Sequence, residues 1–151
     1  MSLILTLELL VGSWYIHYTN FPMWLKGDKV QPTFNYSISS RNGKEGLIDV
    51  VRFMKNGKMK EIIGFDTPLN EENTSFKWRG KGMLALFTSK WEIKYYDKEH
   101  DWALIYFSKT LATPEGYDVI TRKPQLEARE EASILDKLNE LGLENLLTQL
   151  K

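Results

Sequence analysis

The sequence predicts an all-β protein, an eight-stranded antiparallel up-and-down barrel with one α-helix packed outside it. Short runs that alternate apolar and polar residues recur up to Arg122, as half-buried strands do. Asn-Gly pairs at 42–43 and 56–57 separate such runs, and this pair is the strongest short-range hairpin signal. After Pro124 the apolar spacing changes to that of a helix. We expect a single domain over residues 1–151, with the barrel at about 12–122 and a helical tail at about 125–151.

Eight segments are predicted as strands because each is an alternating run bounded by turn residues. They lie near residues 12–20, 33–40, 46–55, 58–67, 74–79, 90–97, 101–108 and 116–122. Closing these strands into a barrel removes the exposed edges that an open sheet would leave. A barrel of eight strands is wide enough to hold one small ligand.

The helix is predicted over about residues 125–141. Gly142 then ends it, as glycine at the position after a helix often does. The stripe expected to face the barrel wall consists of Leu126, Ile134, Leu138 and Leu141. This stripe should pack on the outside of the barrel and leave the mouth open. Four later leucines should tie down the tail, namely Leu143, Leu146, Leu147 and Leu150.

Composition narrows the range of partners. Twenty basic residues balance twenty acidic ones among 151, so no electrostatic footprint for nucleic acid is present. The chain has no cysteine, and its length allows a core that is stable without disulfides. Glu8 interrupts the apolar opening 1–11, which makes a poor signal peptide. We expect a cytoplasmic protein from the chain as given, and a periplasmic or membrane-associated one if a signal was removed.

Three residues are predicted to close one end of the barrel. Gly12 allows a tight turn into the first strand, and Trp14 faces the interior two residues later. Arg122, at the end of the last strand, can lie across the face of that indole. Together they form a plug at the closed end.

These residues carry a family resemblance. The stretch Gly12-Ser13-Trp14-Tyr15, the turn from Asp97 to Ala103, and the run from Tyr117 to Pro124 resemble the lipocalins, in pattern most the small bacterial type. The middle motif departs from the family, since His100 stands where related turns often have tyrosine. The resemblance implies a ligand-binding barrel without a cofactor.

Strand parity and the resemblance together predict which residues line the cavity. Residues two apart share a face, so Ile16 and Tyr18 continue inward from Trp14, and Ile120 and Asp118 do so from Arg122. For the other strands the lipocalin pattern implies the inward residues Phe34, Tyr36, Ile38, Phe76, Trp78, Trp91, Ile93, Tyr95, Ala103, Ile105 and Phe107.

The third strand has two alternative registers. One places Ile48, Val50 and Arg52 inside, and the other places Leu47, Asp49, Val51 and Phe53 inside. We prefer the first. The predicted ligand-binding residues are then Tyr18, Phe34, Tyr36, Val50, Arg52, Phe76, Trp78, Trp91, Ile93, Tyr95, Ile105, Phe107 and Asp118.

The loops predicted at the open mouth are unusually apolar. They are the segments 21–32, 56–57, 80–89 and 109–115. Their apolar residues are Phe21, Met23, Trp24, Leu25, Met83, Leu84, Leu86 and Phe87. Such residues form a lid over the cavity, or they seal the barrel top or make contacts in a dimer.

The sequence gives little support for catalysis. It has no cysteine nucleophile, no Gly-x-Ser-x-Gly motif, no phosphate-binding loop and no paired histidines at metal-ligand spacing. We therefore expect no metal, no cofactor and no enzymatic activity. The alternative is an isomerase or hydrolase that uses Asp118 with Tyr95 or Tyr36 as an acid-base pair.

The predicted function is to bind, and to carry or sequester, a small hydrophobic molecule such as a fatty acid or lysolipid. In the preferred register Arg52 meets the carboxylate or phosphate head of that ligand. A third reading is a protein-interaction module that docks through the apolar mouth. The expected partners are the small ligand and no nucleic acid, with peripheral membrane contact through the mouth loops left open, and the protein is expected to be a monomer or weak dimer.

Overall fold

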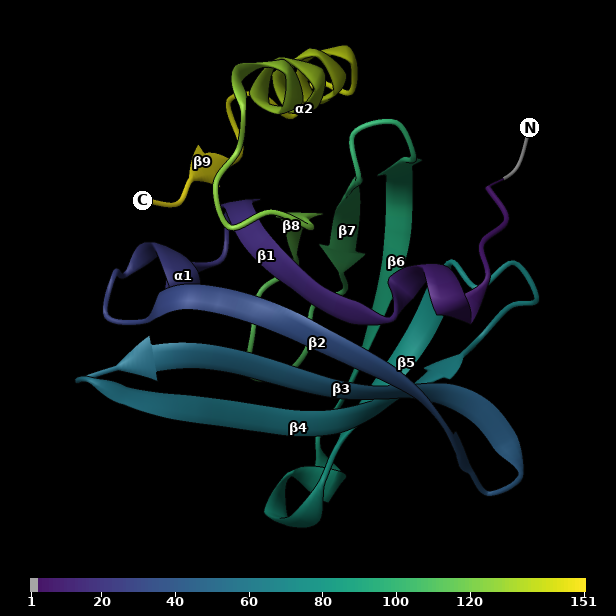
Figure 1. Ribbon diagram of the computed structural model, residues 1–151. Coiled ribbons are helices and arrows are strands. Elements are labelled where there is room, and N and C mark those ends of the chain that lie inside the picture. Colours follow the sequence, from purple (N-terminus) through teal and green to yellow (C-terminus); the bar gives the residue numbers. More distant parts are fainter. Residues whose placement is uncertain (1–2) are drawn as a thin grey trace.

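The computed structural model describes residues 3–151 and shows a closed antiparallel barrel with a helix alongside it (Figure 1). The barrel strands are β1 (Gly12–Thr19), β2 (Val30–Arg41), β3 (Lys44–Lys55), β4 (Lys58–Pro68), β5 (Ser75–Gly80), β6 (Thr88–Asp97), β7 (Trp102–Phe107) and β8 (Gly116–Thr121). The remaining elements are η1 (Leu7–Leu10), α1 (Pro22–Leu25), η2 (Gly82–Leu86), α2 (Ala128–Glu140) and β9 (Thr148–Gln149). Within residues 3–151 no helix has both the length and the apolar character needed to cross a membrane.

Each barrel strand pairs with its neighbours in the chain, and β1 closes the ring against both β8 and β2. This confirms the predicted eight-stranded up-and-down barrel. The seam between β1 and β2 is short, because only residues 12–15 of β1 pair with β2. Further along β1, Tyr18 and Thr19 pair with the tail strand β9. The tail was predicted to be tied down, but its pairing as a strand was not.

Both Asn-Gly pairs form the predicted hairpin turns. Asn42 and Gly43 connect β2 to β3 with φ angles of 54° and 75°, and Asn56 and Gly57 connect β3 to β4 with 52° and 74°. Two consecutive positive φ angles define the turn that matches the twist of paired strands. These turns fix the register of β3 against both neighbours.

The closed end is held by Arg122. Its guanidinium carbon lies 3.7 Å from the centroid of the Trp14 ring, the stacking that the sequence predicted. The same guanidinium donates hydrogen bonds to the backbone carbonyls of Leu9, Val11 and Ser13. Arg122 therefore joins the last barrel strand to both the plug and the segment that precedes β1.

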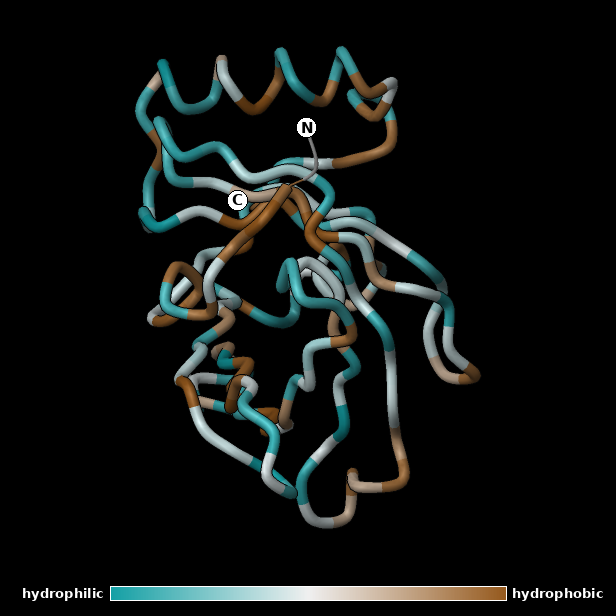
Figure 2. The backbone as a smooth tube through the Cα atoms, turned by 90° about the vertical axis from the view of Figure 1, so that its right-hand side faces the viewer, coloured by the Kyte–Doolittle hydropathy of each residue, from teal (hydrophilic) through white to brown (hydrophobic). Residues whose placement is uncertain are grey.

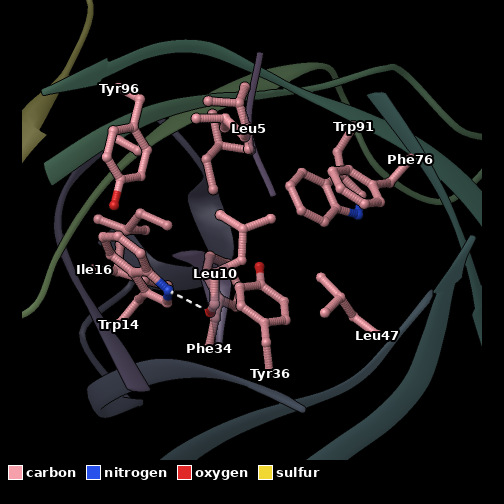
Figure 3. Close-up of a cluster of buried hydrophobic side chains, with 14 of the residues drawn as sticks. Leu5, Leu10, Trp14, Ile16, Phe34, Tyr36, Leu47, Phe76, Trp91 and Tyr96 are labelled. Carbon is pink, nitrogen blue, oxygen red and sulfur yellow. Dashed lines mark hydrogen bonds between the residues drawn. The ribbon is translucent and has the colours of Figure 1, made fainter. Parts of the chain in front are cut away.

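Residues 3–10 fold across the closed end, which the sequence analysis did not predict. Leu5, Leu7 and Leu10 are buried in the same cluster as Trp14, and the Trp14 indole N–H donates to the Leu10 carbonyl at 2.9 Å (Figure 3). Gly12 permits the bend into β1, with a φ of 108°. A Cβ at Gly12 would also lie only 3.0 Å from the Arg122 guanidinium.

Two of the register shifts in the sheet interrupt the alternation of side chains that the sequence predicted to point inward. The ladder between β1 and β8 shifts register between Ile16 and Tyr18, and the ladder between β6 and β7 shifts between Ile93 and Tyr95. Each extra residue inverts the faces of the residues that follow it. Beyond these bulges the residues predicted to point inward point outward.

The helix α2 packs on the outside of β1, β7 and β8, as predicted. Figures 1 and 2, which differ by a quarter turn, both place it along one side of the barrel. Ile134 and Leu138 are buried against Trp102, Leu104 and Val119. The helix begins three residues later than predicted, because Glu127 and Glu130 form a capping box there.

The end of α2 agrees with the prediction except at Leu141. Gly142 follows the helix with a φ of 74°, and the N–H groups of Gly142 and Leu143 donate to the carbonyls of Asn139 and Leu138. This Schellman motif confirms the predicted stop. Leu141 does not join the buried stripe, since it is the helix C-cap and 45% exposed.

Replacing the plug tryptophan should destabilise the fold strongly. We expect Trp14→Ala to lower the free energy of unfolding by about 3–5 kcal/mol, because it empties a fully buried site and removes the ring on which the Arg122 guanidinium stacks. Chemical denaturation measures this change. A loss below about 1 kcal/mol would show that the barrel does not depend on the plug.

Adjacent residues of α2 provide a matched test of the helix interface. Ile134→Ala should cost about 2–4 kcal/mol, because Ile134 is completely buried between the helix and the barrel. Leu135→Ala should change stability by less than about 0.5 kcal/mol, because Leu135 is 47% exposed. Equal effects in urea denaturation would contradict the described packing.

Candidate functional site: the barrel cavity

The interior of the barrel contains two adjoining cavities, named here the inner lobe and the outer lobe. The inner lobe has a volume of about 170 Å³ and the outer lobe, toward the mouth, about 160 Å³. They adjoin because both are lined by Phe34, Val51, Ser89 and Phe107. The inner lobe is completed by Tyr36, Asp49, Trp78 and Trp91. The outer lobe is completed by Phe21, Met23, Trp24, Ile62, Ser108, Thr113 and Asp118.

Stacked aromatic rings form one wall of the inner lobe. The Trp91 ring lies between those of Phe76 and Tyr36, at centroid distances of 4.4 and 5.9 Å, and all three are close to parallel. Figure 3 shows the Tyr36 hydroxyl pointing into the interior. Trp78 fits because β4 has a glycine diagonally across the ladder from it: a Cβ at Gly64 would lie 2.1 Å from the indole nitrogen. The inner lobe is therefore a rigid, largely aromatic chamber.

The segment after β1 closes the mouth, while the other apolar loop does not. Phe21 and Trp24 are buried, and Trp24 meets the Phe53 ring edge-on at 5.8 Å. The sequence left open whether these residues cover the cavity, and in the structure they line its outer lobe. Met83 and Leu86 instead point away, at 95% and 91% exposure. Of the alternatives left open for the second segment, covering the cavity is therefore the one that Met83 and Leu86 do not fit.

Three aspartates are buried inside the barrel. Asp49, Asp66 and Asp118 are at most 5% exposed. Asp49 and Asp66 lie within hydrogen-bonding reach of one another, and Asp66 also accepts the indole N–H of Trp91 at 2.9 Å. Asp118 accepts a hydrogen bond from the Thr19 hydroxyl. One oxygen of each carboxyl group has no hydrogen-bond partner among residues 3–151.

Burial governs the ionisation of these groups. It raises the pKa of Asp118 to about 7 and that of Asp49 to about 6, from an ordinary value of 3.8. The pKa of Asp66 is raised well above its ordinary value by burial and by the negative charge of Asp49. Burial and the three carboxylates also raise the pKa of Tyr36 well above 10. The carboxyl groups of the interior therefore keep their protons up to a higher pH than the same groups do in water.

Nine of the thirteen predicted ligand-binding residues face the barrel interior, and they differ in depth. Those that line a lobe are Phe34, Tyr36, Trp78, Trp91, Phe107 and Asp118. Phe76, Ile93 and Ile105 belong to the packed interior core without lining either lobe. Whether any of them contacts a ligand stays a prediction.

The other four predicted residues lie outside the barrel. Tyr18 and Tyr95 follow the two bulges and pack in the cluster beneath α2. Arg52 and Val50 are outward because β3 adopts the alternative register, with Leu47, Asp49, Val51 and Phe53 inside. These are the corrections to the predicted site.

Arg52 has a structural role on the outer face. It pairs directly across the ladder with Glu61, and its Nε lies 2.5 Å from the Glu61 carboxylate. Counting back from the Asn56-Gly57 turn pairs Arg52 with Glu61, so the sequence contained the signal that decides the register.

The prediction also missed several cavity residues. Asp66 shares the inward face of β4 with Gly64, and its burial was not foreseen. Ser89 lies two residues before Trp91 and therefore shares its face, which parity alone could have indicated. The lining contributed by loops, such as Ser108 and Thr113, carried no pattern in the sequence.

Of the two acid-base pairs that the sequence offered, this geometry contradicts the one with Tyr95, and the pair of Asp118 with Tyr36 stays untested. Tyr95 lies outside the barrel with its ring 5.2 Å from that of Trp102, so it cannot act with Asp118. The hydrogen-bonding side chain at Asp118 is Thr19. Within the described part of the chain, no three His, Cys, Asp or Glu side chains are grouped closely enough to hold a metal ion.

Solved structures with a similar fold include several invertebrate and ligand-binding proteins. Insecticyanin from the tobacco hornworm Manduca sexta is similar over 99% of this chain and 82% of its own, with a TM-score of 0.71 at 10% identity. Lobster apocrustacyanin A1 is similar over 95% of this chain and 77% of its own, with a TM-score of 0.65 at 13% identity. The siderocalin Ex-FABP is similar over 94% and 93%, with a TM-score of 0.66 at 11% identity.

At the level of sequence, no protein-family model and no curated protein matches the chain. At such low identities the structural likeness establishes the fold. The expected likeness to the small bacterial type stays a prediction.

The buried carboxyl of Asp118 should make stability depend on pH. The folded chain keeps this proton up to a pH of about 7, whereas the unfolded chain releases it near 3.8. Between these values folding takes up a proton, so this group's contribution to stability falls as pH rises. We expect Asp118→Asn to match the parent chain at pH 4 and to be more stable by roughly 2–4 kcal/mol at pH 8.

Urea denaturation at several pH values measures this difference. Because parent and variant share every other titrating group, their difference isolates Asp118. Asp136→Asn, at an exposed position of α2, is the control and should show no such trend. A constant difference between pH 4 and pH 8 would mean that Asp118 ionises normally in the fold.

Proposed function

We propose that this chain, which has the lipocalin fold, binds one small and largely apolar organic molecule inside its barrel. The observation that carries the proposal is the pair of adjoining lobes with aromatic walls. Protein interiors are normally packed without voids of this size. Enclosed apolar space with a few polar groups is typical of ligand sites. Enclosure suits carriage or sequestration, in which the ligand is released unchanged.

The volumes limit the size of the ligand. Each lobe is smaller than the roughly 300 Å³ at which ligand pockets usually begin, while the two together reach that range. An occupant would therefore extend through both lobes past the four side chains that they share. One or two rings, or a short branched chain, fit this space better than a long acyl chain.

The charge of the interior argues against a fatty acid. Arg52, expected to meet an anionic head, lies on the outer face in an ion pair with Glu61. The polar groups at the lobes include the carboxyls of Asp49 and Asp118, which repel a carboxylate or phosphate once they ionise, above a pKa of about 6 and about 7. We therefore retain the small apolar ligand and withdraw the fatty acid and lysolipid.

One structural neighbour gives this proposal a precedent. The siderocalin Ex-FABP is described as functioning through dual ligand specificities. A barrel of this shape can thus serve ligand binding, although the ligands themselves do not transfer at 11% identity.

Docking through the mouth is the second candidate. The observation in its favour is the exposure of Met83, Leu86, Phe87 and Leu111 on neighbouring loops at the rim. Exposed apolar patches often mark interaction sites. Peripheral membrane contact through these loops, and the monomeric or weakly dimeric state, stay predictions.

Blocking the shared wall should abolish binding. We expect the uncharged probe N-phenyl-1-naphthylamine to bind with enhanced fluorescence and to quench the tryptophans of the inner lobe. Ser89→Phe should weaken this binding at least tenfold, because Ser89 lines both lobes and a ring there would fill the passage between them.

Ser89→Ala is the matched control and should bind as the parent chain does, since it leaves the space open. Circular dichroism should show both variants folded. If the probe binds Ser89→Phe as tightly as the parent chain, its site lies outside the barrel and the proposal fails. Failure of the parent chain to bind any uncharged apolar probe would also overturn it.

A further inference from the structure

We infer that the barrel selects an organic cation, whose ammonium group pairs with the Asp49–Asp66 carboxyl pair at the inner lobe. This inference rests on the proposed function and adds the charge of the ligand to it. It follows from the balance of charges inside the barrel, from carboxyl oxygens left without partners, and from the aromatic walls.

The charges inside the barrel are all acidic. Asp49 lines the inner lobe with Asp66 beside it, and Asp118 lines the outer lobe. Among residues 3–151, no lysine or arginine lines either lobe. Two basic groups at the ends of the barrel are engaged elsewhere: Arg122 stacks on Trp14, and Lys29 at the mouth pairs with Asp28 at 3.3 Å.

The carboxyl groups have unused hydrogen-bonding capacity. Asp49 Oδ1 is buried without a partner in the part of the chain that the structure describes, and the same holds for Asp66 Oδ2. A buried polar atom without a partner costs free energy that a natural interior rarely carries without compensation. A ligand that donates hydrogen bonds and brings a positive charge would satisfy these atoms and offset the cost of burying the carboxylate.

The walls of the inner lobe also favour a cation. Phe34, Tyr36, Trp78, Trp91 and Phe107 supply five of its eight lining side chains. The faces of aromatic rings attract cations, most strongly where water is excluded. The same rings accept an apolar body by burial. An ammonium group on a small apolar or aromatic skeleton uses both features of the lobe.

The Asp49–Asp66 pair suits this role better than Asp118. Two carboxyl groups in contact cannot both ionise freely, so the pair keeps one proton and presents a single negative charge. The Trp91 N–H bond to Asp66 holds that carboxyl in place. Asp118 instead has the Thr19 hydroxyl as its partner, and its lobe has apolar loop residues from the mouth as neighbours.

Three ligands that differ only in the head group test the inference. Isothermal titration at pH 8 should show 2-phenylethylamine, which is cationic, binding at least tenfold more tightly than 2-phenylethanol. Phenylacetate, which is anionic, should bind more weakly than the alcohol. This comparison uses the unmodified chain, so it holds whether or not any variant folds.

Variants then locate the charge. Because either member of the pair can carry it, the double variant Asp49→Asn/Asp66→Asn should reduce the preference for the amine over the alcohol to less than threefold. The affinity for the alcohol should change little. Asp118→Asn is the control within the same cavity. The logarithm of its amine-to-alcohol affinity ratio should be at least half of the value for the parent chain. Circular dichroism and thermal unfolding confirm that each variant is folded.

The outcomes separate this inference from the proposed function. Equal binding of amine and alcohol would overturn the cation preference while leaving ligand binding intact. A preference that survives the double variant, or that disappears in Asp118→Asn alone, would overturn the assignment to the inner lobe. Binding of none of the three ligands, together with no binding of the uncharged naphthylamine, would defeat both.

Discussion

The contact between Arg122 and Trp14 is the interaction on which the barrel depends. A single guanidinium stacks on the plug and donates hydrogen bonds to three backbone carbonyls, those of Leu9, Val11 and Ser13. It thereby joins β8, the start of β1 and the preceding segment, which are distant in sequence. Lysine could not replace it, because only the planar fork of arginine stacks and donates in several directions at once. With one end sealed in this way, the interior can remain partly unfilled toward the other.

The two unfilled lobes and the buried carboxyl groups beside them lower the stability of the fold, and packing elsewhere must compensate for this. Three buried carboxyl groups and two lobes contribute nothing to packing, whereas the closed end and the face beneath α2 are fully packed. Stability and the proposed binding site are therefore divided between regions. The plug and the helix supply the stability, and the mouth half of the barrel is arranged at the expense of stability. Such a division is common where a site must be preorganised before its ligand arrives.

Much of the fold could be predicted from the sequence because its signals are local. The Asn-Gly turns, the alternation within strands, the stop at Gly142 and the stacking of Arg122 on Trp14 each depend on a few residues. The prediction of the cavity lining depended instead on counting alternate residues along whole strands. One extra residue in a strand makes that count wrong for every residue after it. Tyr18 and Tyr95 were misplaced for that reason. In β3 an inward aspartate contradicted the rule that charges face water, and only the cross-strand partner of Arg52 revealed the register.

The short seam between β1 and β2 has a consequence for access. These strands share a ladder only at residues 12–15, beside the sealed end, and α1 lies on the connection between their mouth ends. Widening the barrel there separates strands that are not hydrogen-bonded to each other, so it breaks no ladder. Elsewhere around the ring the same displacement would break paired backbone groups. The tail strand β9 borders this gap by pairing with Tyr18 and Thr19, so the C-terminal tail forms the wall beside β1 at the one place where β2 does not.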